Sequence, residues 1–390
     1  MVAEHTHDRV PSRLDEALRY AVSRIEKDPQ NVDAIARYLG WHGHTPDAKH
    51  HPDQPIDLAR ERAKQAANRA MEQLRQDGFI PDVVEKSLRL IERSLPLLEM
   101  EACEALMKAG LCFTRLSCEA LLAAGQCFRS KAPFEIASLG SSTALVKPGT
   151  ATSLTRLTSI AKYLMQSCGC ANLMGLLYDA QEIFGRNASE RFTEAVIRAG
   201  GPFEWLDPGT KWFWYIPEPG SNHLVHQIQR VLAATPRIHL ARLRSAIRRG
   251  NAFGSFIPPV KVLELICRRL LFLHIEDGTV IRVSGMASSD ALLTAKEKTL
   301  IEILRLHGPV LEREKFLEHC RERGMDEGTV TQLTSRSLLF QATDAGLYAI
   351  ADAAIPASTI EANERTADIL ANTGQGFPSE GNVFLTWKLQ

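Results

Sequence analysis

The stretch from Ser221 to Ser284, SNHLVHQIQRVLAATPRIHLARLRSAIRRGNAFGSFIPPVKVLELICRRLLFLHIEDGTVIRVS, decides the expected fold. Apolar residues at helical spacing follow a Ser-Asn cap, and a proline ends that helix before a short extended run over 238–240. A second helix is expected over 241–249. A third helix opens at Pro258-Pro259, and a hairpin turns on Asp277-Gly278. This order of helix, strand, two helices and hairpin is typical of a winged helix-turn-helix.

Hairpin patterns recur along the chain at nearly constant spacing. If Phe134, Phe203, Leu271 and Leu338 are equivalent, the steps between them are 69, 68 and 67 residues. Each hairpin pattern follows helical segments of the same kind. A period of this kind indicates an array of one supersecondary unit. The unit before Phe134 has the weakest helical segments, so it is expected to be a degenerate copy.

The predicted fold class is mainly α with small β-hairpins (α+β), with an N-terminal helical region followed by tandem winged helix-turn-helix repeats. The expected domains are an N-terminal helical region over 1–95, a degenerate winged-helix-like repeat over 96–150, winged-helix repeats over 151–220, 221–288 (the basic one) and 289–352, and a C-terminal tail or hairpin over 353–390.

Basic residues are concentrated in the third repeat. Between Leu224 and His274 there are nine basic residues and one acid, Glu264, although the whole chain carries equal numbers of basic and acidic residues. Such a local excess favours a polyphosphate partner, and a solvated basic surface is the plain alternative. The candidate DNA contacts here are Arg242, Arg244, Arg248, Arg249, Lys261, Arg268 and Arg269.

The second hairpin is crowded with aromatic residues over 202–215, PFEWLDPGTKWFWY. An aromatic strand can stack unpaired bases. It can equally pack on its own helices, and the alternation favours packing, because Trp212 and Trp214 share one face while Phe213 and Tyr215 share the other.

The whole-chain composition indicates an intracellular globular protein. No apolar run is long enough to span a membrane, and the first residues lack the apolar stretch of a signal peptide, so we expect a cytoplasmic protein without a membrane partner. Eight scattered cysteines indicate reduced core residues. Cys168-Gly169-Cys170 lacks the spacing of a metal site, and the prolines among the histidines at 42, 44, 50 and 51 indicate a solvated loop, so no metal or other cofactor is expected.

The segment RERAKQAANRAMEQLR, from Arg60 to Arg75, resembles the recognition helix of bacterial sigma factor region four. The resemblance implies that Arg60 contacts a phosphate and that Glu61, Lys64 and Gln65 reach base edges in the major groove. The family's preceding helix is replaced here by TPDAKHHPDQPI at 45–56, whose three prolines are incompatible with a regular helix.

The chain from about Asp15 onward is also similar to sigma-like helix-turn-helix proteins that carry tandem winged domains after a region-four-like motif. The similarity lies in PFEWLDPGTKWFWY, the PRIHLARLRSAIRR run, Pro258-Pro259, and HGPVLEREKFLEHCRERGM with its closing GLYAI. It implies DNA binding with a regulatory role. No segment resembles the region-two helix that melts promoters, so a complete sigma factor is not implied.

No phosphate-binding loop, dinucleotide glycine set, HExxH or nucleophile elbow occurs, so no catalytic residues are expected. The leading hypothesis is a non-catalytic double-stranded DNA-binding protein. Its role would be that of a bacterial, nucleoid-associated transcription regulator or sigma-like accessory factor, with RNA polymerase as a further partner. The alternative is a protein-interaction scaffold of degenerate winged helices that docks RNA polymerase or components of a mobile-element or defence system.

Overall fold

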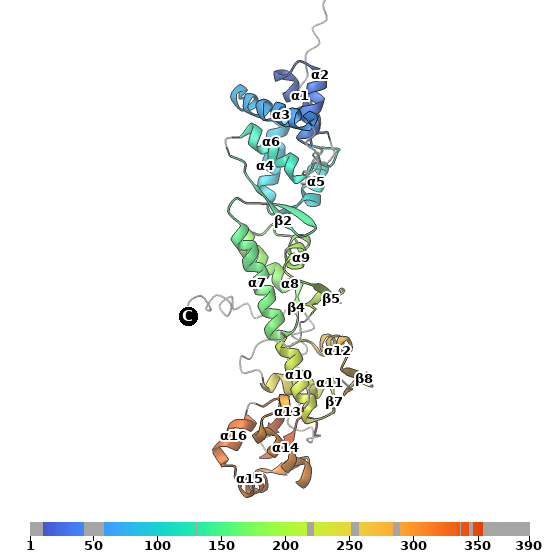
Figure 1. The fold of residues 1–390 in the computed structure, drawn as a ribbon, viewed down its shortest axis with the longest axis vertical. Helices are drawn as coiled ribbons and strands as arrows, with labels where there is room; N and C mark the ends of the chain where they lie inside the picture. The colour runs from blue at the N-terminus through green and yellow to red at the C-terminus, as the bar shows by residue number, and fades with distance from the viewer. Residues whose placement is uncertain are drawn as a thin grey trace, which may run out of the picture. The chain divides into compact units, whose positions relative to one another are not determined.

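The computed structural model describes residues 11–42, 58–129, 131–216, 222–250, 257–283, 289–335, 337–342 and 346–353. The described chain is mainly helical, with small three-stranded antiparallel sheets (Figure 1), which confirms the expected α+β class. Its contacts divide it into two compact units. The N-terminal unit comprises residues up to Ala161 together with Leu176–Gly201, and the C-terminal unit comprises Lys162–Gly175 and the residues from Pro202 onward. No helix among the described residues is both long and apolar enough to cross a bilayer.

The element order helix, strand, helix, helix, strand, strand occurs four times. In each of these repeats the first strand pairs with the third, and the third pairs with the second. The first repeat is α4 (Asp82–Ser94), β1 (Leu97–Leu98), α5 (Glu99–Lys108), α6 (Cys118–Phe128), β2 (Glu135–Leu139) and β3 (Ser142–Val146). The second is α7 (Ala151–Cys168), β4 (Ala171–Asn172), α8 (Leu173–Phe184), α9 (Glu190–Ala199), β5 (Phe203–Asp207) and β6 (Trp212–Tyr215).

The third repeat is α10 (His223–Ala234), β7 (Arg237–His239), α11 (Leu240–Gly250), α12 (Val260–Arg269), β8 (Leu273–Glu276) and β9 (Thr279–Arg282). A short helix, α13 (Ser289–Leu292), precedes the fourth. That repeat is α14 (Ala295–His307), β10 (Val310–Glu312), α15 (Arg313–Glu322), α16 (Glu327–Ser335), β11 (Phe340–Ala342) and β12 (Leu347–Ile350).

The four hairpins lie where the sequence spacing places them. The short first strands β1, β4 and β10 were not anticipated, because two or three residues are too few to show a period of two. The first repeat is also more complete than expected. Helix α4, which the sequence analysis assigned to the N-terminal region, occupies the place of its first helix, and its sheet has all three strands.

The N-terminal helices α1 (Leu14–Ile25), α2 (Pro29–Tyr38) and α3 (Leu58–Asp77) share one hydrophobic core with the first repeat. Trp41 is fully buried in this core, and its indole Nε1 donates to the carbonyl oxygen of Ala120 at 3.1 Å. The small face of α3 packs closely, with Ala67 and Ala70 buried. Helix α3 thereby covers α6, the third helix of the first repeat.

The third helix of a repeat packs against the hairpin of the repeat before it at two junctions. Within the N-terminal unit, α9 packs on β1 and β2 of the first repeat. Within the C-terminal unit, α12 packs on β5 of the second repeat. Helix α16 instead packs against α15 and β11 of its own repeat.

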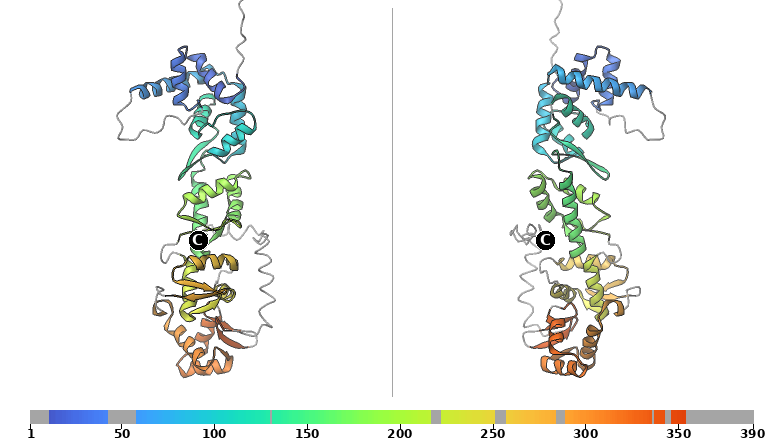
Figure 2. Two further views of the ribbon diagram at one scale, coloured as in Figure 1. Left: turned by 90° about the vertical axis from the view of Figure 1, so that its right-hand side faces the viewer. Right: turned by 60° about the vertical axis from the view of Figure 1, so that its left-hand side comes forward.

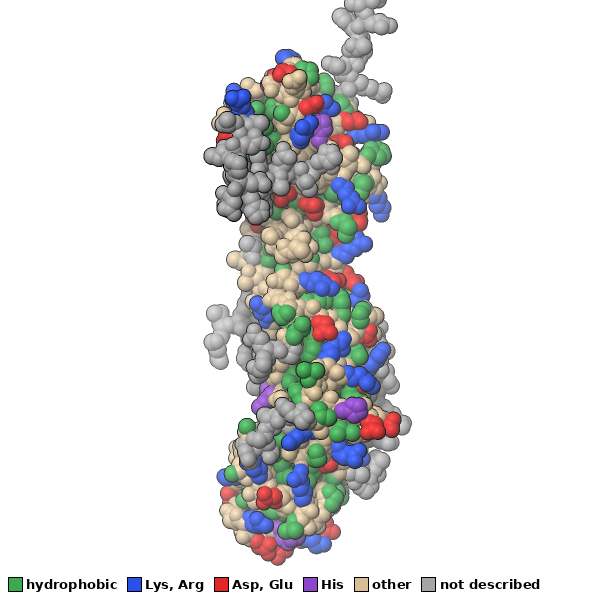
Figure 3. Space-filling view, turned by 45° about the vertical axis from the view of Figure 1, so that its right-hand side comes forward, with side chains coloured by type: hydrophobic (Ala, Val, Ile, Leu, Met, Phe, Trp, Pro, Cys, Tyr) green, Lys and Arg blue, Asp and Glu red, His purple; other side chains and the backbone are tan. Residues whose placement is uncertain are grey.

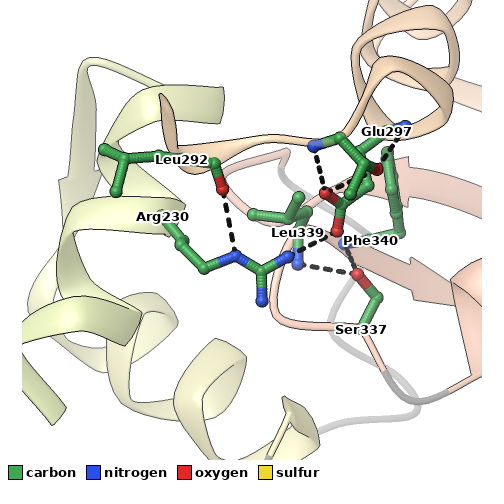
Figure 4. Close-up of polar contacts among 7 residues, drawn as sticks. Arg230, Leu292, Glu297, Ser337, Leu339 and Phe340 are labelled. Atoms are coloured by element: carbon green, nitrogen blue, oxygen red, sulfur yellow. Dashed lines mark hydrogen bonds and ion pairs between the residues drawn. The ribbon is translucent and has the colours of Figure 1, made fainter. Parts of the chain in front are cut away.

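The third and fourth repeats adjoin each other through a different set of contacts, and Figure 2 shows them side by side in yellow to gold and orange to red. Arg230 of α10 donates to Glu297 of α14 at 2.5 Å and to the carbonyl oxygen of Leu292 at 3.3 Å (Figure 4). Arg305 of α14 donates in turn to the carbonyl oxygen of Ala234. These contacts fix the third repeat against the fourth.

Candidate nucleic-acid interface

The second helix of each repeat begins at an equivalent position. The first backbone amides of α8, α11 and α15 donate to the carbonyl oxygens of Lys211, Gly278 and Gly346, which lie in the turns of their hairpins. Helix α5 likewise begins directly after the first strand of its repeat, so the four helices can be compared residue by residue from their first residues. Helix α5 has three acids and one lysine, and α8 has two acids and no basic residue. Helix α15 has three arginine or lysine residues and three acids, whereas α11 has four arginines and no acid. The basic excess of the third repeat is therefore concentrated on α11.

The arginines of α11 lie on one broad exposed arc. Leu240, Leu243, Ala246 and Ile247 form the buried face of the helix. At 100° per residue, the remaining positions span the opposite side in the order 244, 248, 241, 245, 249, 242. Arg248 lies near the middle of this arc and is exposed. We call these six positions the α11 arc.

The two edges of the α11 arc are held by backbone carbonyl groups. Arg244 Nε donates to the carbonyl oxygen of Pro258 at 3.0 Å, and Arg242 donates to that of Asp352 in the fourth repeat. A carbonyl group carries no net charge, so these two hydrogen bonds by themselves do not neutralise the guanidinium groups. Arg249 is partly buried at the end of the helix.

The three predicted contacts on α12 are engaged by acids. Arg269 donates to Glu204 at 2.9 Å and to the carbonyl oxygen of Trp205 at 2.9 Å, both on β5. Lys261 Nζ lies 3.6 Å from a carboxylate oxygen of Asp207. Arg268 forms an i,i+4 pair with Glu264 at 2.6 Å. These cations join α12 to the preceding hairpin or to itself.

Glu204 connects the two partners of this junction. One of its carboxylate oxygens accepts from the indole Nε1 of Trp214 at 2.9 Å, and the other accepts from Arg269. The hydrogen bond from Trp214, followed by that from Arg269, holds the pKa of Glu204 below its ordinary value. Sequence reasoning missed Glu204 and Asp207 because nothing in the local pattern of β5 indicates a partner more than fifty residues away.

The aromatic residues of the second hairpin pack mainly against one another. Phe203 stacks on Phe213 with ring centroids 4.7 Å apart, and Trp205 meets Phe213 edge to face. Phe213 and Trp214 are buried. These contacts agree with the packing interpretation of this strand.

Helix α3 presents two of its predicted base-contacting residues to solvent. Lys64 and Gln65 are exposed, and Lys64 Nζ lies 3.6 Å from Glu61 one turn earlier, in an i,i+3 pair that is worth little at a surface. The side chain of Arg60 and residues 43–57, which would precede the helix in a helix-turn-helix, lie outside the described residues. The structure therefore describes α3 as a packing helix with a polar outer face.

The outer face of the third sheet adds two residues that the sequence analysis did not select as contacts. Arg237 and His239 are exposed on β7, on either side of the buried Ile238. His239 Nδ1 accepts from the backbone amide of Ala241 at 3.3 Å, so it lies at the amino-terminal end of the α11 arc. The nearby hairpin tip carries exposed Glu276 and Asp277, which limits the basic surface on that side.

No three His, Cys, Asp or Glu side chains in the described ranges come together as a set of metal ligands. The histidines at 44, 50 and 51 lie outside those ranges, and His42 Nε2 lies 3.5 Å from Asp33. The eight cysteines are free thiols, and burial raises the pKa of Cys267 to about 12. A thiol in this state is a poor metal ligand and a poor nucleophile.

On the face drawn in Figure 3, Lys and Arg side chains are interspersed with Asp and Glu side chains. A basic surface is therefore a property of single elements such as α11.

Comparisons with protein-family models, with curated proteins and with solved structures found no match.

Proposed function

We propose that this protein is a non-catalytic double-stranded DNA-binding protein that acts in transcription as a regulator or sigma-like accessory factor. The observation that carries the proposal is the charge of α11. It has four arginines and no acid, whereas the equivalent helices of the other three repeats are acidic or balanced. Duplex DNA carries a dense line of phosphates, and an acid-free row of guanidinium groups complements it.

The repeat architecture supports the same proposal. We interpret the order helix, strand, helix, helix, strand, strand, with the strands in the spatial order first, third, second, as a winged helix-turn-helix, so that the chain carries four of them in tandem. This fold is widely used on duplex DNA, but a fold alone does not define a function. The charge of the third repeat is the feature that selects DNA among the partners of such a fold.

The test measures binding of the full chain to a random-sequence 30-base-pair duplex and to a single strand of equal length. Fluorescence anisotropy reports the binding at each concentration of a salt series. We expect the duplex to bind more tightly. We also expect log K to fall linearly with log salt concentration, with a slope of about −0.9 per phosphate contact. Equal and salt-insensitive binding to both probes, or no binding at 50 mM salt, would refute the proposal.

A second candidate function is a protein-interaction scaffold that docks RNA polymerase or components of a mobile-element or defence system. It is favoured by the third helices of the first three repeats, because each is packed against α3 or against an earlier hairpin and is therefore withdrawn from a DNA groove. Purified core RNA polymerase on a biosensor surface provides the test. Saturable binding to the polymerase by both the unchanged protein and Arg248→Glu, together with no binding to duplex DNA, would favour the scaffold.

A further inference from the structure

We infer that the chain contacts DNA through the α11 arc of the third repeat, along the phosphate backbone and without reading bases, while the third helix α12 stays docked on the preceding hairpin. The inference rests on the proposed function and specifies its binding surface. It differs from the usual arrangement of a helix-turn-helix, in which the second helix of the motif enters the major groove.

Helix α12 is already packed against the hairpin of the preceding repeat. Its buried face, which includes Val262, Leu263 and Ile266, packs in the core of the third repeat. Its outer side packs on β5, where Arg269 makes two hydrogen bonds. For α12 to enter a groove, these contacts would have to break and the carboxylate of Glu204 would lose a charged partner. Hydrogen bonds between charged groups are among the stronger ones in proteins, so this loss opposes undocking.

Three positions of the α11 arc are exposed, Ala241, Arg242 and Arg248, whereas two guanidinium nitrogens of Arg249 are buried. The main contacts of α11 with other helices and strands are those with α10, α12 and β7 of its own repeat, and Gly250 at its carboxyl end lies against Leu338 of the fourth repeat. Beyond these, Arg242 reaches Asp352 at one edge of the arc. Arg248, in the middle, has no hydrogen-bond or ion-pair partner among the described residues. It can therefore donate to a phosphate oxygen without losing a bond.

Small residues lie between the arginines of the α11 arc. Ala241 and Ser245 lie beside Arg248 on the arc, one turn apart along the helix. Small side chains there let a sugar-phosphate backbone approach the helix surface, with guanidinium groups on either side. The arc carries no Asn, Gln, Asp or Glu, the side chains that pair with adenine or cytosine edges, so the bidentate base contact open to it is that of arginine with guanine. Its chemistry suits phosphate oxygens, which carry no sequence information.

Two exposed acids limit the extent of the proposed surface. The hairpin tip with Glu276 and Asp277 would repel phosphates, so the contact is centred on Arg248, in the last turn of α11, and leaves the tip free. Arg237 on β7 is exposed and carries a further cation on the same repeat. It is included in the test as a further exposed cation of the third repeat.

The experiment compares three charge reversals in the full chain, each checked by circular dichroism and thermal unfolding. Arg248→Glu tests the arc. Arg268→Glu tests α12, since Arg268 is 55% exposed and bonded only within its own helix. Arg321→Glu is the matched control, because Arg321 is exposed at the position of α15 equivalent to Arg248. Affinities are measured on two 30-base-pair duplexes of unrelated sequence across a salt series.

We expect Arg248→Glu to weaken binding to both duplexes by a similar factor and to lower the salt slope by about one. Arg237→Glu combined with Arg248→Glu should lower the slope by about two. Arg268→Glu and Arg321→Glu should bind like the unchanged protein. If the unchanged protein binds duplex DNA but Arg268→Glu loses more affinity than Arg248→Glu, or if one duplex is strongly preferred, the inference is wrong while the proposed function stands. If the unchanged protein binds no duplex, the proposed function fails first.

Discussion

Glu297 is the residue on which the junction of the third and fourth repeats depends most. One carboxylate oxygen accepts from Arg230 of α10, and the other accepts from the backbone amide and hydroxyl of Thr294 at 2.8 and 2.9 Å (Figure 4). Glu297 therefore completes the capping box of α14 and also joins two repeats, and it is only 7% exposed. Loss of a capping interaction costs about 1 kcal/mol. Loss of a charge-assisted hydrogen bond costs roughly 1.5–3 kcal/mol, less where the remaining partner reaches water.

Since Arg230 keeps 28% of its side chain exposed, we expect Glu297→Ala to cost about 2–4 kcal/mol in total. In a unit of this size, 1 kcal/mol shifts the unfolding temperature by roughly 2–4 °C. Differential scanning calorimetry of the full chain should then show the transition of the C-terminal unit lowered by roughly 4–16 °C. Hydrogen exchange should accelerate in the first turn of α14.

Two further variants separate the contributions of Glu297. Glu297→Gln keeps an acceptor for Thr294 but removes the charge that faces Arg230, so it should cost less than Glu297→Ala. Glu302→Ala, at an exposed position of the same helix, is the control and should change the transition little. If Glu297→Ala shifts the transition no more than Glu302→Ala does, our account of this junction is wrong.

Three other changes have defined outcomes. Burial raises the pKa of Asp179 from 3.8 to about 6, so the stability contributed by its protonated form is present below pH 3.8 and is lost as the pH rises towards 6. Asp179→Asn should therefore stabilise the chain by about 1–3 kcal/mol at pH 7.5 and have little effect at pH 4. Urea unfolding at both pH values would check this prediction. Trp41→Phe removes the hydrogen bond to the carbonyl oxygen of Ala120 and should cost about 1–3 kcal/mol, measured by chemical unfolding; an unchanged midpoint would contradict the role given to this bond. A β-carbon at Gly250 would lie 2.0 Å from Leu338 Cδ2. Gly250→Ala should therefore lower the free energy of unfolding by about 1–3 kcal/mol, despite alanine's better helix propensity. A raised unfolding temperature would show that the leucine can move away.

The repeat alignment explains why Asp179 is unusual. It occupies the position on α8 that corresponds to the fully buried Ala246 on α11, where a carboxylate loses most of its hydration. The sequence pattern of α8 gave no warning, because the surrounding apolar residues still fit a helix. A comparison of aligned repeats could have identified it, but the alignment needs the strand pairing that only the structure provides.

Local chemistry was sufficient for much of the fold. Glycine and proline punctuation, caps and apolar periodicity predicted the helices of the last three repeats, and the Asp277-Gly278 turn predicted the third hairpin. The near-constant spacing of the hairpins predicted the array. These features were readable because each depends on residues within about ten positions of one another.

Tertiary contacts decided which charged residues remain at the surface. Arg248 and Arg269 look equivalent in the sequence, since both stand in the last turn of a basic amphipathic helix. Arg269 lies against Glu204, 65 residues earlier, whereas Arg248 faces away from every described partner. Whether a cation is neutralised depends on acids brought near by chain folding over long separations. That information resides in the packing of one repeat on the next and cannot be read from the charge pattern of either helix.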